Sequence, residues 1–247
     1  MNPCLLIPIY DHGSTISDVV AALEPLRLPC LIVDDGSREE TRKALELVSG
    51  SYSWVQLERH PRNRGRGAAL RTGYRWAGRL GFSHVVQIDA DGQHDAGDIP
   101  AVLEAVRRQP DALVLGSPVF DRSAPRSRRY GRWISRLWVW LETCSLAIRD
   151  PLCGLRGVPL ASTLRLLERA PCGDRMDFDT ELAVRLVWEG VPVVNVAARI
   201  RYFPDGISHF RMLADNLRLT SLHTRLFCTM WLHLPRMIVL RRRGTAV

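Results

Sequence analysis

The sequence predicts an α/β fold in which helices cover both faces of a mostly parallel sheet. Two observations support this prediction. Apolar runs of strand length alternate with segments of helical period through the first half of the chain. Polar loops directly follow three of these runs, and in an open parallel sheet such loops meet at the carboxyl edge, where ligands bind.

The alternation predicts the elements in order. Strands are expected at residues 4–10, 29–33, 54–57, 84–88 and 112–115. Helices are expected between them, at residues 14–26, 38–48, 65–80 and 98–108. Beyond residue 116 the pattern predicts a loop at 118–132, helices at 133–148 and 178–188, strands near 191–202 and a helical, increasingly apolar remainder from 209.

Composition narrows the class of protein. The 247 residues are 46% hydrophobic and 24% charged, which excludes fibrous, low-complexity and wholly disordered proteins. A net charge of +8 favours anionic partners. The six cysteines include no CxxC pair, so no zinc or redox site is predicted. The N-terminus resembles neither a signal peptide nor a membrane span, and we expect a cytoplasmic protein.

The sharpest chemical feature is the loop after the predicted strand at 84–88. Asp89 and Asp91 lie two residues apart, and Gln93 adds an amide oxygen. Oxygen ligands at this spacing suit Mg²⁺ or Mn²⁺, which could stabilise charge on a departing diphosphate. A solvated surface turn is the alternative, but the preceding run is more apolar than such a turn requires.

Two further loops are candidates for nucleotide binding. Asp34 and Asp35 follow a predicted strand, where a carboxylate can accept hydrogen bonds from a ribose hydroxyl or a base N–H. The alternative, a turn with a helix cap, explains Gly36 and Ser37 but not two adjacent acids. The glycine-rich segment around Arg66 begins a predicted helix, which favours either an anion or close helix packing.

Four segments, IPIYDHGSTI, VDDGS, NRGRGAALRTGY and QIDADGQHD, resemble in this order the family 2 glycosyltransferases of the GT-A fold. The resemblance is strongest to the dolichyl-phosphate-mannose-synthase-like branch. DPLCGLR from Asp150, FDTEL from Phe178 and GISHF from Gly206 are similar to three further elements of that branch. The resemblance implies a GT-A domain over residues 1–211 and a C-terminal helical extension, with amphipathic helices, over 212–247.

The resemblance also implies roles for individual residues. The nucleotide-binding and phosphate-binding residues would be Pro8, Tyr10, Asp34, Asp35, Arg66, Asp89, Arg156, Ser208 and Arg211. The metal ligands would be Asp89, Asp91 and Gln93, which gives Asp91 a catalytic role. Asp179 or Glu181 would face the acceptor and act as general base for a hydroxyl, whereas an ionised lipid phosphate needs no base. The alternative for Glu181 is an ion pair with Arg185.

The apolar segment 226–240 bears on membrane attachment. It has only 15 residues and contains His233, Pro235 and Arg236, so it is too short for a span. The tryptophans at 133, 138 and 140 and the arginines at 241–243 favour a position in the membrane interface. The alternative is a pair of helices packed on the sheet or on a partner subunit.

These observations and the resemblance together predict an inverting, metal-dependent hexosyltransferase of cell-envelope glycan synthesis. Its partners would be a UDP- or GDP-linked sugar and a lipid-linked or glycan acceptor at the inner face of the cell membrane. The alternatives are a sugar-1-phosphate nucleotidyltransferase, a non-catalytic scaffold and a basic nucleic-acid-binding module. The last is disfavoured because the arginines are scattered among acids and no nucleic-acid motif is present.

Overall fold

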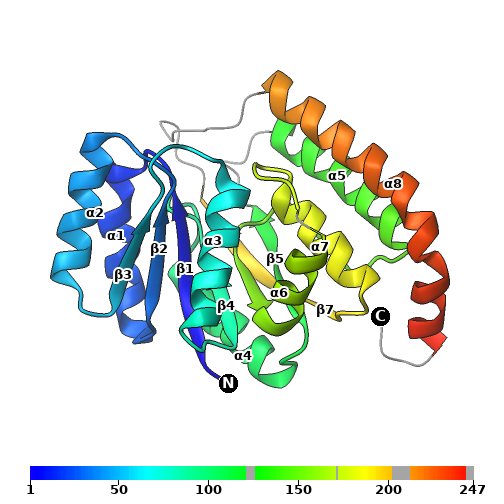
Figure 1. The fold of residues 1–247 in the computed structure, drawn as a ribbon, viewed down its shortest axis with the longest axis horizontal. Coiled ribbons are helices and arrows are strands. Elements are labelled where there is room, and N and C mark those ends of the chain that lie inside the picture. Colours follow the sequence, from blue (N-terminus) through cyan, green and yellow to red (C-terminus); the bar gives the residue numbers. More distant parts are fainter. Residues whose placement is uncertain (121–125, 171, 202–211, 243–247) are drawn as a thin grey trace.

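The computed structural model describes residues 1–120, 126–170, 172–201 and 212–242. A seven-stranded sheet forms its centre, with the order β3-β2-β1-β4-β6-β5-β7 (Figure 1). The strands are β1 Pro3–Ile9, β2 Cys30–Asp34, β3 Val55–Arg59, β4 His84–Gln87, β5 Leu113–Phe120, β6 Arg156–Pro159 and β7 Val193–Ile200. Only β6 runs antiparallel to its neighbours, β4 and β5, so the mostly parallel sheet is confirmed.

Helices lie on both faces of this sheet. They are α1 Gly13–Leu23, α2 Glu39–Ser51, α3 Arg66–Arg79, α4 Ile99–Arg108, α5 Arg126–Thr143, α6 Leu160–Arg169, α7 Phe178–Trp188 and α8 Met212–Arg242. Figure 1 shows α5 and α8 side by side, outside α7. Arg132 on α5 and Arg218 on α8 line the same cleft as the loops after β1 and β4.

Strand β1 shows how the pleat divides the core. Leu5 and Ile7 pack with α1, α2 and α4, whereas Cys4 and Leu6 pack with α3, α6 and α7 on the other face. All four side chains are fully buried. Because successive strand side chains point to opposite faces, an unbroken apolar run is what a strand covered on both faces requires.

The second half of the chain departs from the predicted elements. Strand β6 was not predicted, because its four residues include an arginine and a glycine and carry no apolar run. Helix α6 was not predicted either, although its buried residues Leu160, Thr163, Leu166 and Leu167 have helical spacing. The predicted loop at 118–132 is wrong at both ends. Strand β5 continues to Phe120 because it pairs with β7 over eight residues, and α5 begins at Arg126. Helix α5 then ends at Thr143, where Cys144 adopts a positive φ of 48°.

Helix α8 belongs to the same core as the sheet. Leu222, Leu226, Met230 and Met237 are buried and join the cluster formed by α3, α6 and α7. Within the apolar segment predicted at 226–240, Leu226, Met230 and Met237 therefore pack on the protein, whereas Trp231, Leu232, Ile238 and Val239 are exposed. Among the described residues, no helix combines the length and the apolar character that crossing a membrane requires.

Candidate active site

A cleft of about 600 Å³ opens at the carboxyl edge of the sheet. Its lining includes the loops after β1, β2 and β4 and the start of α3, so the predicted gathering of polar loops is confirmed. Seven of the residues predicted for the site line it: Pro8, Tyr10, Asp35, Arg66, Asp89, Asp91 and Gln93. The volume is in the range of sites for small organic ligands.

The loop after β4 presents two carboxylates with different environments. Asp91 accepts a hydrogen bond from the backbone N–H of Gln93 at 3.0 Å, which fixes the turn. Burial and the neighbouring charge of Asp89 raise the pKa of Asp91. Burial also opposes the charge on Asp89, but Arg66 and His94 outweigh it and hold the pKa of that carboxyl below its ordinary value. The two acids therefore lie together at the cleft, and Arg66 forms an ion pair with Asp89.

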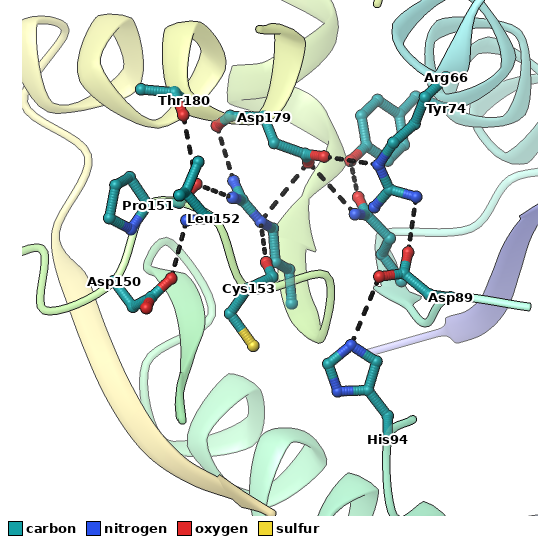
Figure 2. A network of polar contacts seen from close by, with 12 residues as sticks. Arg66, Tyr74, Asp89, His94, Asp150, Pro151, Leu152, Cys153, Asp179 and Thr180 are labelled. Carbon is teal, nitrogen blue, oxygen red and sulfur yellow. Dashed lines mark hydrogen bonds and ion pairs between the residues drawn. The ribbon is translucent and has the colours of Figure 1, made fainter. Parts of the chain in front are cut away.

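Arg66 connects this loop to helix α7. Its Nη1 lies 2.6 Å from Oδ1 of Asp89, and its Nε donates to Oδ2 of Asp179 at 2.9 Å (Figure 2). Asp179 also accepts from Nε2 of Gln87 at 3.2 Å, and Gln87 in turn accepts from the hydroxyl of Tyr74 at 2.6 Å. Burial disfavours the charged guanidinium, but the two carboxylates more than compensate and raise the pKa of Arg66.

Arg156 lies deeper than the resemblance implied. Its side chain is fully buried and donates to the carbonyl oxygens of Pro151, Cys153 and Asp179 at 2.6–2.9 Å (Figure 2). Each guanidinium nitrogen thus has a backbone partner, and the side chain is absent from the cleft lining. In this structure Arg156 joins the 150–153 loop to the start of α7.

The two adjacent acids at the end of β2, Asp34 and Asp35, make different contacts. Asp34 is fully buried and accepts from the backbone N–H of Ser37 at 2.9 Å and from Nε of Arg59 at 2.9 Å. Asp35 lines the cleft and accepts from Nδ1 of His60 at 2.7 Å. Asp34 therefore shapes the turn, and Asp35 is the acid beside the candidate nucleotide site.

The glycine-rich start of α3 is explained by close packing and by an internal anion. Gly65 has φ +104°, and a side chain there would overlap the carbonyl oxygen of Asp174. The backbone N–H groups of Arg64 and Gly65 donate to Asp35 at 3.0 and 2.7 Å. The carboxylate of Asp35 thus already occupies the backbone donors that precede this helix.

Glu181 lies away from the cleft lining. It is 1% exposed and accepts from Nε of Arg185 at 2.9 Å, from Nη2 of Arg225 at 2.9 Å and from the backbone N–H of Gly173 at 2.9 Å. The ion pair with Arg185 that the sequence offered as an alternative is therefore present, although buried rather than on the surface. Ser208 and Arg211 lie outside the described residues.

Sequence reasoning missed several cleft residues. Three arginines, Arg132 on α5, Arg175 before α7 and Arg218 on α8, line the cleft. They come from segments far apart in the chain, so no local spacing could have indicated them. His94 also lines the cleft, 3.4 Å from Asp89, and only its position beside the acidic loop could have suggested it.

The donor set fits a hard divalent cation. The described residues contain no group of three or more histidine, cysteine, aspartate or glutamate side chains arranged to hold a metal ion. Asp89, Asp91 and Gln93 nevertheless supply oxygen donors from one short loop, and a diphosphate could complete their coordination. Nδ1 of His94 is buried beside them without a hydrogen-bond partner among the described residues. This is a polar site that a charged ligand would complete.

Comparisons with known proteins agree with this geometry. The polyprenol monophosphomannose synthase of Mycolicibacterium smegmatis is 32% identical over 225 residues, covering 87% of this chain and 82% of that protein. The undecaprenyl-phosphate mannosyltransferase of Micrococcus luteus is 30% identical over 203 residues, covering 79% and 82%.

Solved structures share the fold. A mannosyltransferase of Pyrobaculum calidifontis in complex with GDP-Man and Mn²⁺ matches 97% of this chain and 73% of its own, with a TM-score of 0.59 and 16% identity. Glucosyl-3-phosphoglycerate synthase of Mycobacterium tuberculosis with Mn²⁺ and UDP-glucose has a TM-score of 0.62 and 16% identity, covering 94% and 79%. These likenesses confirm the GT-A fold. Residues 4–171 match Glycosyl transferase family 2, and the chain belongs to that family as a glycosyltransferase of the hexosyltransferase kind.

Proposed function

We propose that this chain transfers a hexose from a nucleoside-diphosphate sugar to a lipid-linked phosphate, with inversion at the anomeric carbon. The observation that carries the proposal is the charge pattern of the cleft. Asp89 and Asp91 reach it from the loop after β4, whereas Arg132 and Arg218, which pair with Asp150 and Asp215, reach it from α5 and α8. Such an arrangement suits a cation and diphosphate beside the acidic loop and an acceptor phosphate beside the two arginines.

Asp89, Asp91 and Gln93 would hold Mg²⁺ or Mn²⁺ on the diphosphate. The bound cation would supply positive charge that stabilises the departing nucleoside diphosphate. Pro8, Tyr10 and Asp35 would line the nucleotide, in keeping with their place in the cleft. An acceptor oxygen that approaches from the part of the cleft formed by α5 and α8 would attack opposite the leaving diphosphate, and this displacement inverts the configuration.

A phosphate acceptor removes the need for a general base. Its oxygen is already ionised, and neither Asp179 nor Glu181 belongs to the cleft lining. Asp179 would then act as a positioning residue, since it holds Arg66 next to Asp89. The lipid-phosphate acceptor named for the relatives from M. smegmatis and M. luteus supports this choice. Family membership favours transfer over the nucleotidyltransferase, scaffold and nucleic-acid alternatives.

The test is a transfer assay on the full chain with Mn²⁺, a polyprenyl phosphate in detergent and a panel of GDP- and UDP-linked hexoses. Asp91→Asn should lower metal-dependent transfer by at least about a hundredfold, because it removes a metal ligand. Asp111→Asn, at an exposed turn before β5, is the matched control and should retain transfer. Full metal-dependent transfer by Asp91→Asn would overturn the metal role, and proton spectra of the product report the anomeric configuration.

We also propose that α5 and α8 lie against an anionic membrane. Large apolar side chains are exposed along both helices: Trp133, Ile134, Leu137, Trp138 and Leu141 on α5, and Leu217, Trp231, Leu232, Ile238 and Val239 on α8. Each helix has a single acid, Glu142 or Asp215, and both acids are buried. Exposed tryptophan and leucine beside arginine suit a headgroup zone of negative charge.

Vesicle sedimentation tests this attachment. The chain should sediment with phosphatidylglycerol vesicles, and a Trp231→Ser, Leu232→Ser variant should bind severalfold less because it removes exposed apolar area. Leu47→Ser is the matched control, since Leu47 is 72% exposed and its helix, α2, lies on the opposite side of the molecule from α5 and α8 (Figure 1). Equal binding by the double variant, or no binding by the unaltered chain, would contradict the proposal.

A further inference from the structure

Arg66 lies between two carboxylates, and one of them, Asp89, is also a ligand of the candidate metal site. Its guanidinium bridges Asp89 at 2.6 Å and Asp179 at 2.9 Å (Figure 2). Its side chain is 18% exposed and lines the cleft. The strongest cation on Asp89 in this structure is thus an arginine of the chain itself.

A divalent cation at Asp89 and Asp91 would meet this guanidinium as a like charge. Both would share the Asp89 carboxylate in a partly buried site, where repulsion between cations is weakly screened. A metal ion arriving alone therefore has to compete with Arg66. A metal ion arriving with a diphosphate brings its own compensating anion, and that anion also offers the guanidinium a new partner.

We propose that Arg66 neutralises Asp89 while the donor site is empty. As a result, the cation binds together with the nucleoside diphosphate and does not bind before it. This inference rests on the metal site of the proposed function. It makes Arg66 a positioning residue that opposes the binding of the cation alone and favours the binding of the cation with the nucleoside diphosphate. Asp179 contributes by holding the guanidinium at its other end.

The connection to α7 explains why the guanidinium stays in place. Asp179 accepts from Gln87 as well as from Arg66, and its Oδ1 lies 3.5 Å from Nε of the buried Arg156. The carboxylate is therefore fixed from three sides, and Arg66 has one firmly held partner and one, Asp89, on the loop that would bind metal. Arg66 can therefore exchange Asp89 for a diphosphate partner while its contact with Asp179 stays in place.

The test measures Mn²⁺ binding by calorimetry or by the spin resonance signal of free Mn²⁺, with and without GDP or UDP. Arg66→Gln should bind Mn²⁺ alone at least ~10-fold more tightly than the unaltered chain, because a competing charge is lost. Arg66→Lys keeps the charge and should bind as weakly as the unaltered chain. Arg71→Gln, five positions along α3 and paired with Asp174, removes the same charge elsewhere and should leave Mn²⁺ binding unchanged.

The unaltered chain supplies a second measurement that does not depend on how a variant folds. The nucleoside diphosphate should tighten Mn²⁺ binding by at least ~10-fold, and this coupling should shrink in Arg66→Gln. Equal or weaker binding of Mn²⁺ alone by folded Arg66→Gln, or independent binding of cation and nucleotide by the unaltered chain, would overturn the inference while the metal site stands. If no nucleotide brings Mn²⁺ to the chain, both the metal site and the inference fall.

Discussion

A methyl group on Gly154 would overlap the carboxylate of Asp89. Gly154 belongs to the loop that precedes β6, whereas Asp89 follows β4, so two distant segments meet at the candidate metal site. Gly154→Ala should therefore move the Asp89 carboxylate away from Arg66 and Asp91. We expect nucleotide-dependent Mn²⁺ binding to weaken by at least ~10-fold, since displacing a ligand or its support typically costs that much.

Gly50→Ala serves as the control for this substitution. Gly50 lies in α2, and no atom would contact an added Cβ within 4 Å. This variant should gain about 0.5–1 kcal/mol in free energy of unfolding and keep its Mn²⁺ binding. Normal Mn²⁺ binding by Gly154→Ala would show that Asp89 does not need the space beside this glycine.

Replacement of Glu181 by glutamine separates a structural role from a catalytic one. The buried carboxylate accepts from two arginines and a backbone N–H, so Glu181→Gln should lose about 1.5–3 kcal/mol in free energy of unfolding. Transfer at a temperature where the variant is folded should stay within about tenfold of normal, because general-base catalysis alone contributes about 100-fold or more. Urea denaturation and the transfer assay measure the two effects.

Glu39→Gln is the control variant for Glu181→Gln. Glu39 forms an exposed pair with Lys43 at 4.0 Å, and its loss should cost less than about 0.5 kcal/mol. A collapse of transfer in folded Glu181→Gln would instead assign the base to this residue.

The buried pair between α5 and α8 predicts a pH dependence of stability. Glu142 accepts from Nδ1 of His223 at 2.8 Å, while burial raises its pKa above the ordinary 4.5. A raised pKa means that the folded state favours the protonated acid. The contribution of this carboxyl is therefore fully present below pH 4.5 and is lost as pH rises through the folded value.

Glu142→Gln removes this titration. The free energy of unfolding of the unaltered chain, relative to this variant, should fall as pH rises above 4.5, by up to about 1.4 kcal/mol per pH unit while one proton is released. Urea denaturation of both proteins between pH 4 and 7 measures the difference. A difference that stays constant over this range would refute the assignment.

The cysteines should react in two groups. Burial raises the pKa of Cys4, Cys153 and Cys172 to about 12. Cys30 is fully buried, and burial raises its pKa as well. Cys144 and Cys228 are exposed. Because the thiolate is the reactive form, iodoacetamide at pH 8 should label only these two in the folded chain and all six after denaturation. Mass spectrometry counts the labels, and early labelling of Cys30 would contradict the fold.

The first half of the chain could be predicted because its signals are local. Strands β1, β2 and β4 lie in short apolar runs, and the helices α1 to α4 each show a helical period, so their positions could be predicted within a few residues. The polar loops that follow β1, β2 and β4 could be located for the same reason, and their meeting at one edge follows from parallel strands alone.

The structure of the second half of the chain depends on pairing and packing between distant segments. β5 extends across Pro118 only because β7 lies beside it, and the buried Arg156 is satisfied by carbonyl oxygens of Pro151 and Asp179. Spacing along the chain indicates neither the pairing of β5 with β7 nor the contact of Arg156 with Asp179. For the same reason the sequence could nominate Glu181 but could not show that two arginines and a backbone N–H already hold it.

By itself, then, the sequence determined the parallel α/β sheet, its binding edge and the acidic loop of Asp89 and Asp91, because each is indicated by residues that are neighbours in the chain. Only the tertiary structure decided that Arg66 bridges Asp89 to Asp179 and that Arg132 and Arg218 reach the same cleft. These contacts join α3, α5, α7 and α8. They form when buried charges find partners in the packed protein, which no single segment of the sequence specifies.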